Sequence, residues 1–226
     1  MFTHPHNITT WKDGQNILAV PEINENVLQL KNIRDFDHKN KSIEGAQRYF
    51  DDDYDLNALA NCTIYSIPFG KSWIYSHLIL GFRFDDGREL LLSVEARRRP
   101  DEDFSVTLGF LPYYGLIYIW WTYNDLIGLR LIVRKDQVYS YVLNFDRNMS
   151  QKIFLDCLKR THTLASHPEV YGSLFNNCTT NIIKHCTDCL GTRYPSFDYR
   201  VILSGKIDGY LQEKWWVKEV IRLKDC

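Results

Sequence analysis

The segment FNNCTTN at residues 175–181 places Cys178 where an irregular stretch is expected to become a helix. Unpaired N–H groups and the macrodipole at a helix N-terminus favour the thiolate, which is the nucleophilic form of cysteine. Backbone N–H groups beside Cys178, or the amide of Asn177, could hold an oxyanion. Because NCT also occurs at 61–63, the tripeptide alone decides nothing. Cys178 is therefore a candidate nucleophile, with a disulfide partner or a small core residue as the alternatives.

The hairpin at 76–98 supplies a candidate base and a candidate acid. The even positions from 78 to 84 and from 90 to 96 are apolar, whereas the odd positions include several polar side chains, among them His77 and Glu95. Matching the apolar faces through a three-residue loop at 85–87 sets His77 opposite Glu95. Directly opposed Cβ atoms lie roughly 4.5–5.5 Å apart, so the carboxylate could orient the imidazole. An ordinary cross-strand polar pair is the alternative.

Cys178, His77 and Glu95 together match the Cys–His–acid arrangement of thiol hydrolases and acyltransferases. In that arrangement the thiolate attacks a carbonyl and holds the acyl group as a thioester, while the carboxylate fixes the imidazole tautomer. This chemistry needs no cofactor. The pattern therefore predicts transfer of an acyl group to an amine or to water.

The other cysteines fit structural roles. Cys62 lies in an expected strand, Cys157 on the apolar face of an expected helix, and Cys226 at the chain end. The segment HCTDC at 185–189 offers one imidazole and two thiols, but zinc needs four ligands and the chain has no second pair at metal-binding spacing. We expect no metal site, and either a disulfide within this segment or two free thiols.

The elements that position these residues follow from periodicity and turn signals. Aromatic and β-branched residues predict strands at 62–67, 73–84, 88–97, 115–122, 128–134 and 138–143. Helical spacing predicts helices from about 148 to Pro168 and from about 176 to Gly191, and one or two more within 197–224. Residues 1–30 form an N-terminal extension, and 35–42 a surface loop. Strands followed by helices are typical of an α+β fold, here a single domain over 31–226.

The composition limits the class of function. The chain has 226 residues and a formal net charge of −1, so it lacks the electrostatic footprint of a nucleic-acid-binding protein. Neither a signal peptide nor an apolar run of 18 residues is present in the chain. We expect either a cytosolic protein or a soluble portion whose targeting or membrane segment lies outside this chain.

Six motifs resemble the bacterial Lnb N-terminal periplasmic domain family. They are NIRDFD at 32–37, SHLILGF at 76–82, LLSVEARR at 91–98, YYGLIYI at 113–119, DLIGLRLIVRK at 125–135 and HPEVYGSLFNNCTTNI at 167–182. They run in the family order and cover most of residues 30–210. Six ordered motifs are far more specific than any one of them.

This resemblance implies a permuted papain-like fold of the NlpC type, in which the histidine strand precedes the cysteine helix. It also implies an enzyme that moves a fatty acyl chain from a phospholipid to the N-terminal amine of a lipoprotein, in the periplasm or at the outer face of the bacterial inner membrane. Position by position, Cys178 matches the nucleophile, His77 the base and Glu95 the third member. The residues matched to substrate and oxyanion support are Asn177, Ser76, Arg97 and Arg34.

Two other functions stay open from the sequence. A thiol amidase or peptidase of cell-wall peptides would release the acyl group to water, and a non-catalytic binding domain would keep the fold without the chemistry. An apolar groove beside Cys178 would favour acyl transfer, whereas a narrow polar cleft would favour the peptidase. The sequence indicates no oligomeric state.

Overall fold

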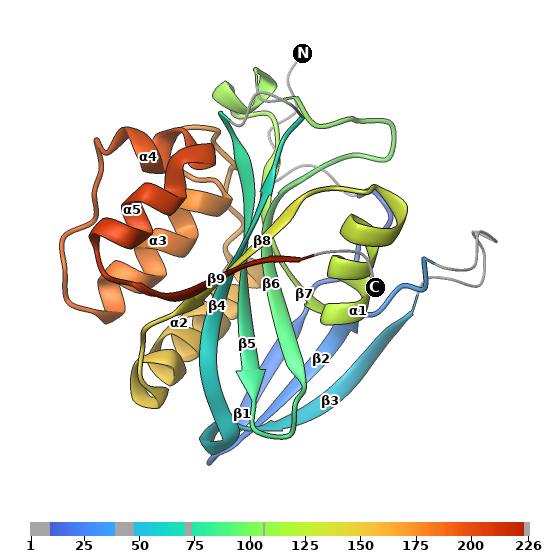
Figure 1. Ribbon diagram of the computed structural model, residues 1–226. Helices are drawn as coiled ribbons and strands as arrows, with labels where there is room; N and C mark the ends of the chain where they lie inside the picture. Colours follow the sequence, from blue (N-terminus) through green and yellow to red (C-terminus); the bar gives the residue numbers. More distant parts are fainter. Residues whose placement is uncertain (1–9, 39–47, 71–73, 106, 224–226) are drawn as a thin grey trace.

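The computed structural model describes residues 10–38, 48–70, 74–105 and 107–223 as one large sheet with helices on both faces (Figure 1). Its strands are β1 (Val20–Asn24), β2 (Val27–Arg34), β3 (Tyr49–Asp55), β4 (Leu59–Pro68), β5 (Ser76–Phe84), β6 (Glu89–Arg97), β7 (Gly115–Thr122), β8 (Val138–Leu143) and β9 (Val217–Leu223). The order is β1-β2-β7-β6-β5-β4-β8-β9, and β3 pairs with β2. Only the β2–β7 pair is parallel among the described strands. The fold is therefore α+β, as the sequence predicts.

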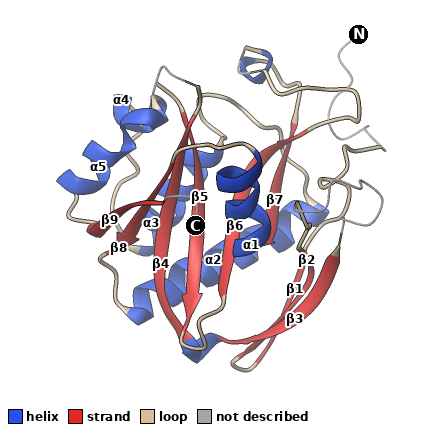
Figure 2. Cartoon of the chain, turned by 45° about the vertical axis from the view of Figure 1, so that its right-hand side comes forward, coloured by secondary structure: helices blue, strands red, loops and turns tan. Residues whose placement is uncertain are grey.

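The helices divide between the two faces of the sheet (Figures 1 and 2). One face carries α2 (Arg147–Ser166), α3 (Cys178–Cys189), α4 (Tyr199–Ile202) and α5 (Ile207–Glu213). The other carries α1 (Tyr123–Gly128), which continues as a π-helical turn, η4 (Leu129–Val133). Short 3-10 turns are η2 (Leu56–Ala58), η3 (Leu108–Phe110) and η5 (Ser204–Lys206). Because both faces are covered, the central strands are buried on both sides.

Two hydrophobic cores lie on opposite faces of the sheet, and successive side chains of the β5–β6 hairpin point into them alternately. Leu80 pairs with Leu92, and the N–H of Phe84 donates to the carbonyl oxygen of Arg88, as the three-residue loop predicts. The even positions of both strands join the larger core, which includes residues of α2 and α3. Odd positions such as Ile79 join the smaller core under α1. The parity predicted from the sequence is confirmed by this register.

The predicted strand at 128–134 is wrong, because this segment completes α1 and forms the π-helical turn η4. Thr122 caps α1 by accepting a hydrogen bond from the N–H of Asp125 at 3.2 Å. Leu126 and Leu131 pack into the smaller core, so a helical face satisfies residues whose composition alone favours a strand. Packing of Leu126 and Leu131 in the smaller core therefore outweighs the strand propensity of this segment.

The C-terminal segment also differs from its prediction. Helices α4 and α5 lie within 197–224 as expected, but Val217–Leu223 is strand β9, which pairs with β8. The segment expected as an N-terminal extension, 1–30, contributes β1 and the start of β2 to the sheet. Of the expected surface loop, 35–38 has no regular structure and the rest lies outside the described residues.

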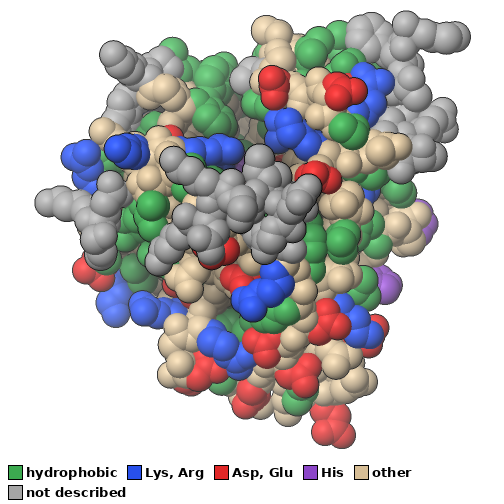
Figure 3. Space-filling view, turned by 90° about the vertical axis from the view of Figure 1, so that its right-hand side faces the viewer, with side chains coloured by type: hydrophobic (Ala, Val, Ile, Leu, Met, Phe, Trp, Pro, Cys, Tyr) green, Lys and Arg blue, Asp and Glu red, His purple; other side chains and the backbone are tan. Residues whose placement is uncertain are grey.

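The face of the molecule shown in Figure 3 carries interspersed acidic and basic side chains. Ion pairs at the surface of the described residues include Arg88 with Asp52 at 2.7 Å and Arg147 with Asp85 at 2.8 Å. This mixture agrees with the formal net charge of −1.

Candidate active site

Cys178 is the first residue of α3, and hydrogen bonds between neighbouring residues cap the N-terminus of this helix. Asn177 Oδ1 accepts from the N–H of Thr180 at 3.0 Å, and Thr180 Oγ1 accepts from the N–H of Asn177 at 2.9 Å. This capping box satisfies N–H groups that the helix cannot pair internally. Asn177 Nδ2 donates to the carbonyl oxygen of Ser173 at 2.6 Å. Since the Asn177 amide is engaged in the turn, main-chain N–H groups at the helix start are better oxyanion donors.

The Cys178 sulfur lies where the β5–β6 ladder ends. Pairing between these strands stops at Ile79. The N–H of Phe84 donates to β6, and the alternation of an antiparallel ladder turns the N–H of Leu78 in the same direction. That N–H is close enough to the Cys178 sulfur to lower the pKa of the thiol. The Cys178 thiol therefore lies near the main chain of the residue that follows His77.

The surroundings keep the Cys178 thiol protonated at neutral pH. Burial raises its pKa, and the nearby charge of Glu95 adds to the increase. The N–H of Leu78 and the hydroxyl and N–H of Thr179 act in the opposite direction, lowering the pKa, but they do not outweigh burial. The nucleophile would therefore need a base to remove its proton.

A hydrogen-bond chain joins His77 to Glu95 through Ser93. The Nε2 atom of His77 lies 2.7 Å from Ser93 Oγ, which donates to Glu95 Oε1 at 3.0 Å. Gln15 Nε2 donates to the other oxygen, Oε2, at 3.1 Å. Because the only hydroxyl proton of Ser93 goes to the carboxylate, its oxygen must accept from Nε2–H of His77. The free electron pair is then on Nδ1, which has no hydrogen-bond partner among the described residues.

The pKa values of His77 and Glu95 are both lowered, which keeps His77 neutral and Glu95 ionised. Burial lowers the pKa of His77 to about 4; the charge of Glu95 opposes this, and those of Arg130 and Arg134 add to it. Burial would raise the pKa of Glu95. The interaction with His77, the charges of Arg130 and Arg34 and the hydrogen bond from Ser93 outweigh that effect, so the pKa of this carboxyl group is lowered. At neutral pH the site thus holds a neutral base beside a carboxylate.

Arg34 is part of a buried ion pair. Its Nε donates to Asp125 Oδ2 at 3.0 Å, and the Asp125 side chain is fully buried. The guanidinium lies 3.6 Å from the ring centroid of Trp121 and 3.9 Å from that of Phe36. Arg34 acts on Glu95 through its charge, without a hydrogen bond to it. It supports the site electrostatically.

Arg97 and Ser76 support the site through other residues. Arg97 Nε donates to the main-chain oxygen of Gln15 at 2.8 Å, and its guanidinium stacks on Trp11 at 4.3 Å. Arg97 therefore holds the segment whose glutamine contacts the candidate carboxylate. The main chain of Ser76 is bonded twice to the Ser204 hydroxyl, each time at 2.8 Å, which anchors the start of β5.

The structure brings the predicted residues together with one gap. His77 and Glu95 belong to one hydrogen-bond network. Cys178 lies near the main chain of Leu78, the residue after His77. Within the described residues, no hydrogen bond joins Cys178 to His77. Sequence reasoning missed Ser93 and Gln15. The odd parity that Ser93 shares with His77 and Glu95 could have indicated it, whereas nothing in the sequence around Gln15 points to a residue 80 positions away.

The remaining cysteines are free thiols, with Cys226 outside the described residues. They are Cys62, Cys157, Cys186 and Cys189. His185, which precedes Cys186, hydrogen-bonds with Asp156 at 2.6 Å and with Tyr118 at 2.9 Å. In the part of the chain that the structure describes, no group of three or more potential ligands is arranged to hold a metal ion.

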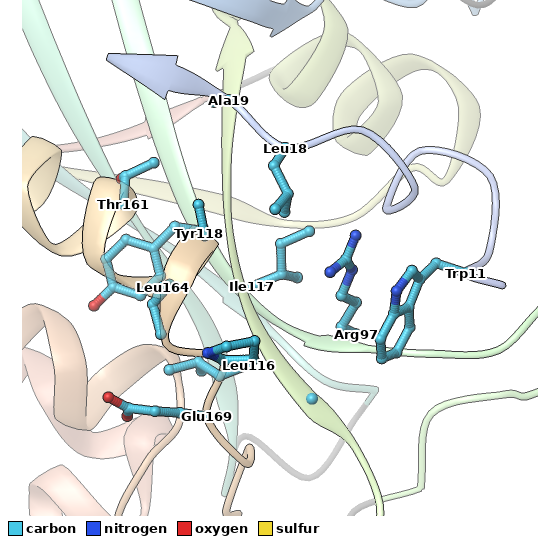
Figure 4. Close-up of a pocket in the computed structure, with 13 residues that line it drawn as sticks. Trp11, Leu18, Ala19, Arg97, Leu116, Ile117, Tyr118, Thr161, Leu164 and Glu169 are labelled. Atoms are coloured by element: carbon cyan, nitrogen blue, oxygen red, sulfur yellow. The ribbon is translucent and has the colours of Figure 1, made fainter. Parts of the chain in front are cut away.

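Three of the cavities between described residues lie near the sheet and helices. The smallest, about 30 Å³, has Arg97 and Trp11 on one side and Tyr118 and Leu164 on the other (Figure 4). The other two are each about 570 Å³. One lies between α2 and α3, and the other is lined by residues of β3, β4, β8, β9 and the turn between β5 and β6. None of these three is lined by Cys178, so none of them is an acyl groove or a polar cleft at the sulfur.

Fold and site together define a class of protein. It is an α+β domain in which a cysteine at the start of a capped helix lies near a buried His–Ser–Glu hydrogen-bond network. The chain belongs to the Lnb N-terminal periplasmic domain family, whose family model matches residues 46–205. This confirms the family that the six motifs predict. The match includes Cys178, His77 and Glu95 but not Arg34.

Other comparisons add no relative: no curated protein and no solved structure was found to match the chain. The family description assigns the domain to the periplasm, a bacterial compartment. Among the described residues, we find no helix with the length and apolar character needed to cross a membrane.

Proposed function

We propose that this domain is a thiol enzyme that transfers acyl groups through a thioester on Cys178. The observation that carries the proposal is the position of Cys178 at a helix start, where the main-chain N–H of Leu78, the residue after His77, is close enough to lower the pKa of the thiol. A neutral imidazole with a free Nδ1 and a carboxylate behind it is the arrangement that a buried thiol needs in order to lose its proton.

The first step forms the thioester. The sulfur attacks the carbonyl carbon of an ester, and the thiol proton passes to Nδ1 of His77. Glu95 stabilises the resulting imidazolium through Ser93, as a carboxylate does in a triad. Main-chain N–H groups at the start of α3 hold the oxyanion. Collapse breaks the carbon–oxygen bond, and the leaving alcohol takes the proton from His77.

The second step releases the acyl group to an amine. The amine attacks the thioester carbon, a carbon–nitrogen bond forms, the carbon–sulfur bond breaks, and the thiol recovers a proton. Lipoprotein N-acylation with phospholipid acyl chains in the periplasm is the specific reaction that we propose, on the ground of family membership. The order of His77 before Cys178 supports a permuted papain-like arrangement as part of this proposal.

An activity-based thiol probe tests the nucleophile. We expect labelling of the wild type, strong loss of labelling in Cys178→Ala, and no loss in Cys189→Ala, which removes a partly exposed thiol. Labelling that survives Cys178→Ala would rule out the proposal. Absence of labelling in the wild type, with intact fold, would favour the non-catalytic domain.

A second assay separates transfer from hydrolysis. Phospholipid vesicles serve as the donor, and a diacylglyceryl-cysteine peptide with a free N-terminal amine serves as the acceptor. Mass spectrometry of the products should show an N-acylated peptide. Free fatty acid as the sole product would contradict transfer, and cleavage of cell-wall peptides would indicate the amidase instead.

A further inference from the structure

Two arginines of the segment that continues α1 lie on the same face of the sheet as His77 and Glu95. Odd positions of β5 and β6 point towards this segment, as Ile79 does in the smaller core. Arg130 lies within η4 and Arg134 follows its last residue, so the two are about one helical turn apart. The charges of both arginines act on His77. The pair is therefore close to the candidate base.

Arg130 is largely buried but poorly paired. Its side chain is 12% exposed, and its Nη1 donates to Asp136 Oδ2 at 3.3 Å, which is long for a hydrogen bond between charged groups. Its Nε atom is buried and has no hydrogen-bond partner in the described part of the chain. A buried donor without an acceptor costs free energy, and an anion that reached this guanidinium would recover it.

Arg134 adds a second positive charge at the same place. Its side chain is exposed and forms no ion pair or hydrogen bond among the described residues. Its main-chain N–H donates to the carbonyl oxygen of Leu129 at 3.0 Å, which closes the π-helical turn. Such turns are rare, and they occur frequently at functional sites.

The positive charge of the two arginines exceeds the negative charge in contact with them. Asp136 is the carboxylate that pairs with Arg130. Glu95 also attracts Arg130, but through its charge and without a hydrogen bond to it. Burial lowers the pKa of Arg130, and the nearby charge of Arg134 adds to the decrease, so the two guanidinium groups repel each other. An anion between them would relieve this repulsion.

We propose that Arg130 and Arg134 bind the phosphodiester group of a phospholipid acyl donor. The planar, charged fork of a guanidinium matches the geometry of phosphate oxygens, and two arginines can hold one such group between them. Because Nε of Arg130 is covered by protein, we expect this side chain to shift when the phosphodiester binds. The proposal rests on the proposed function, which makes a phospholipid the donor.

The position of the two arginines suits a donor whose ester must reach Cys178. In a glycerophospholipid only a few bonds separate the phosphate from the ester carbonyl groups. Glu95 acts through its charge on both Arg130 and Cys178, so these two residues lie at the same part of the fold. A phospholipid held by its phosphate at η4 thus has its ester groups close to the candidate nucleophile.

Binding to the Cys178→Ala variant of the intact chain tests the site without turnover. The ligand is dihexanoylphosphatidylcholine below the concentration at which it forms micelles, and the readout is the Nε–H signals of the arginines in nitrogen-15 NMR. Dihexanoylglycerol, which has the same acyl chains but no phosphate, is the matched ligand. We expect the phospholipid to bind about tenfold more tightly than dihexanoylglycerol and to be alone in shifting the signal of Arg130.

Two further substitutions in this variant identify the residues that bind the phosphate. Arg134→Gln changes an exposed side chain, and it should weaken phospholipid binding about tenfold while leaving dihexanoylglycerol binding unchanged. Arg130→Lys retains the charge but loses the planar fork, and it should have a similar effect. Urea unfolding shows whether each variant is folded, and Arg134→Gln decides alone if Arg130→Lys is not. The control is Arg193→Gln, at an exposed arginine beyond the C-terminal end of α3, which should bind both ligands unchanged.

Three results would overturn the proposal. The first is equal affinity for the phospholipid and for dihexanoylglycerol, and the second is unchanged phospholipid binding in Arg134→Gln. The third is that inorganic phosphate or hexanoate binds as tightly as the phospholipid, which would assign the arginines to a free anion. The proposed function fails differently: Cys178 of the wild type would not react with a thiol probe, while phosphate-dependent lipid binding would persist.

Discussion

The hydroxyl oxygen of Ser93 lies 2.7 Å from Nε2 of His77, on the neighbouring strand. This contact replaces the direct pairing of His77 with Glu95 that the hairpin register predicts. The serine passes the influence of the carboxylate to the imidazole and selects the tautomer with a free Nδ1. Ser93 is therefore the residue on which the proposed base depends.

Ser93→Ala should slow thioester formation by roughly 10–100-fold, because the imidazole loses its orienting partner. It should also destabilise the fold by about 1–2 kcal/mol, since one side of a buried hydrogen bond is removed. Single-turnover acylation and urea unfolding measure the two effects. Ser150→Ala is the matched control, because the buried Ser150 hydroxyl has no hydrogen-bond partner in the described part of the chain. An acylation rate equal to that of the wild type would show that the relay is not used.

The buried His77 predicts a loss of stability in mild acid. Its pKa is 6.5 when exposed and about 4 in the folded protein, where burial disfavours the charged form. Between these values the unfolded chain binds a proton that the folded chain does not, so stability falls as the pH falls. The contribution is complete above pH 6.5 and decreases by up to about 3 kcal/mol as the pH approaches 4.

Urea unfolding of His77→Asn over this pH window measures that contribution. The variant should show a flatter pH dependence than the wild type, by about 3 kcal/mol across the window. His162→Asn removes an exposed histidine from α2 and should retain the wild-type slope. Equal slopes for wild type and His77→Asn would mean that His77 is accessible to protons in the folded state.

The part of the site that follows from apolar periodicity could be predicted from the sequence. Alternation in the β5–β6 hairpin fixes which side chains share a face, and so places His77 and Glu95 together. The capping residues before Cys178 likewise indicate the helix start. These features depend on local rules, namely strand parity and helix capping.

The remainder depends on contacts that local rules do not contain. Gln15 reaches Glu95 from 80 residues away, through a segment without periodicity. Leu129–Val133 has the composition of a strand, but Leu131 packs as part of a helical turn. Val217–Leu223 is a strand because the exposed edge of β8 is available to it. Each of these outcomes is decided by what the rest of the chain offers as a partner.

The charge of Glu95 should be detectable at the sulfur of Cys178. Because this carboxylate raises the pKa of the thiol, Glu95→Gln should lower that pKa and increase the thiolate fraction. We expect alkylation of Cys178 by iodoacetamide at neutral pH to become roughly threefold faster, with acyl transfer nonetheless impaired. Site-resolved mass spectrometry measures the rate, and the exposed, distant Glu219→Gln is the control. Slower or unchanged alkylation would contradict electrostatic contact between Glu95 and the sulfur.

Arg34→Lys should be destabilising although it retains the charge. The planar guanidinium contacts the rings of Phe36 and Trp121 and donates to Asp125, and an ammonium group cannot reproduce this geometry. We expect a loss of about 2 kcal/mol in urea unfolding, because cation–π contacts weaken and the buried carboxylate is less well paired. Arg48→Lys, at an exposed ion pair with Asp35, should change stability by less than about 0.5 kcal/mol. If both variants unfold with the wild-type midpoint, the stacked geometry of Arg34 contributes nothing to stability, and its effect on Glu95 is one of charge alone.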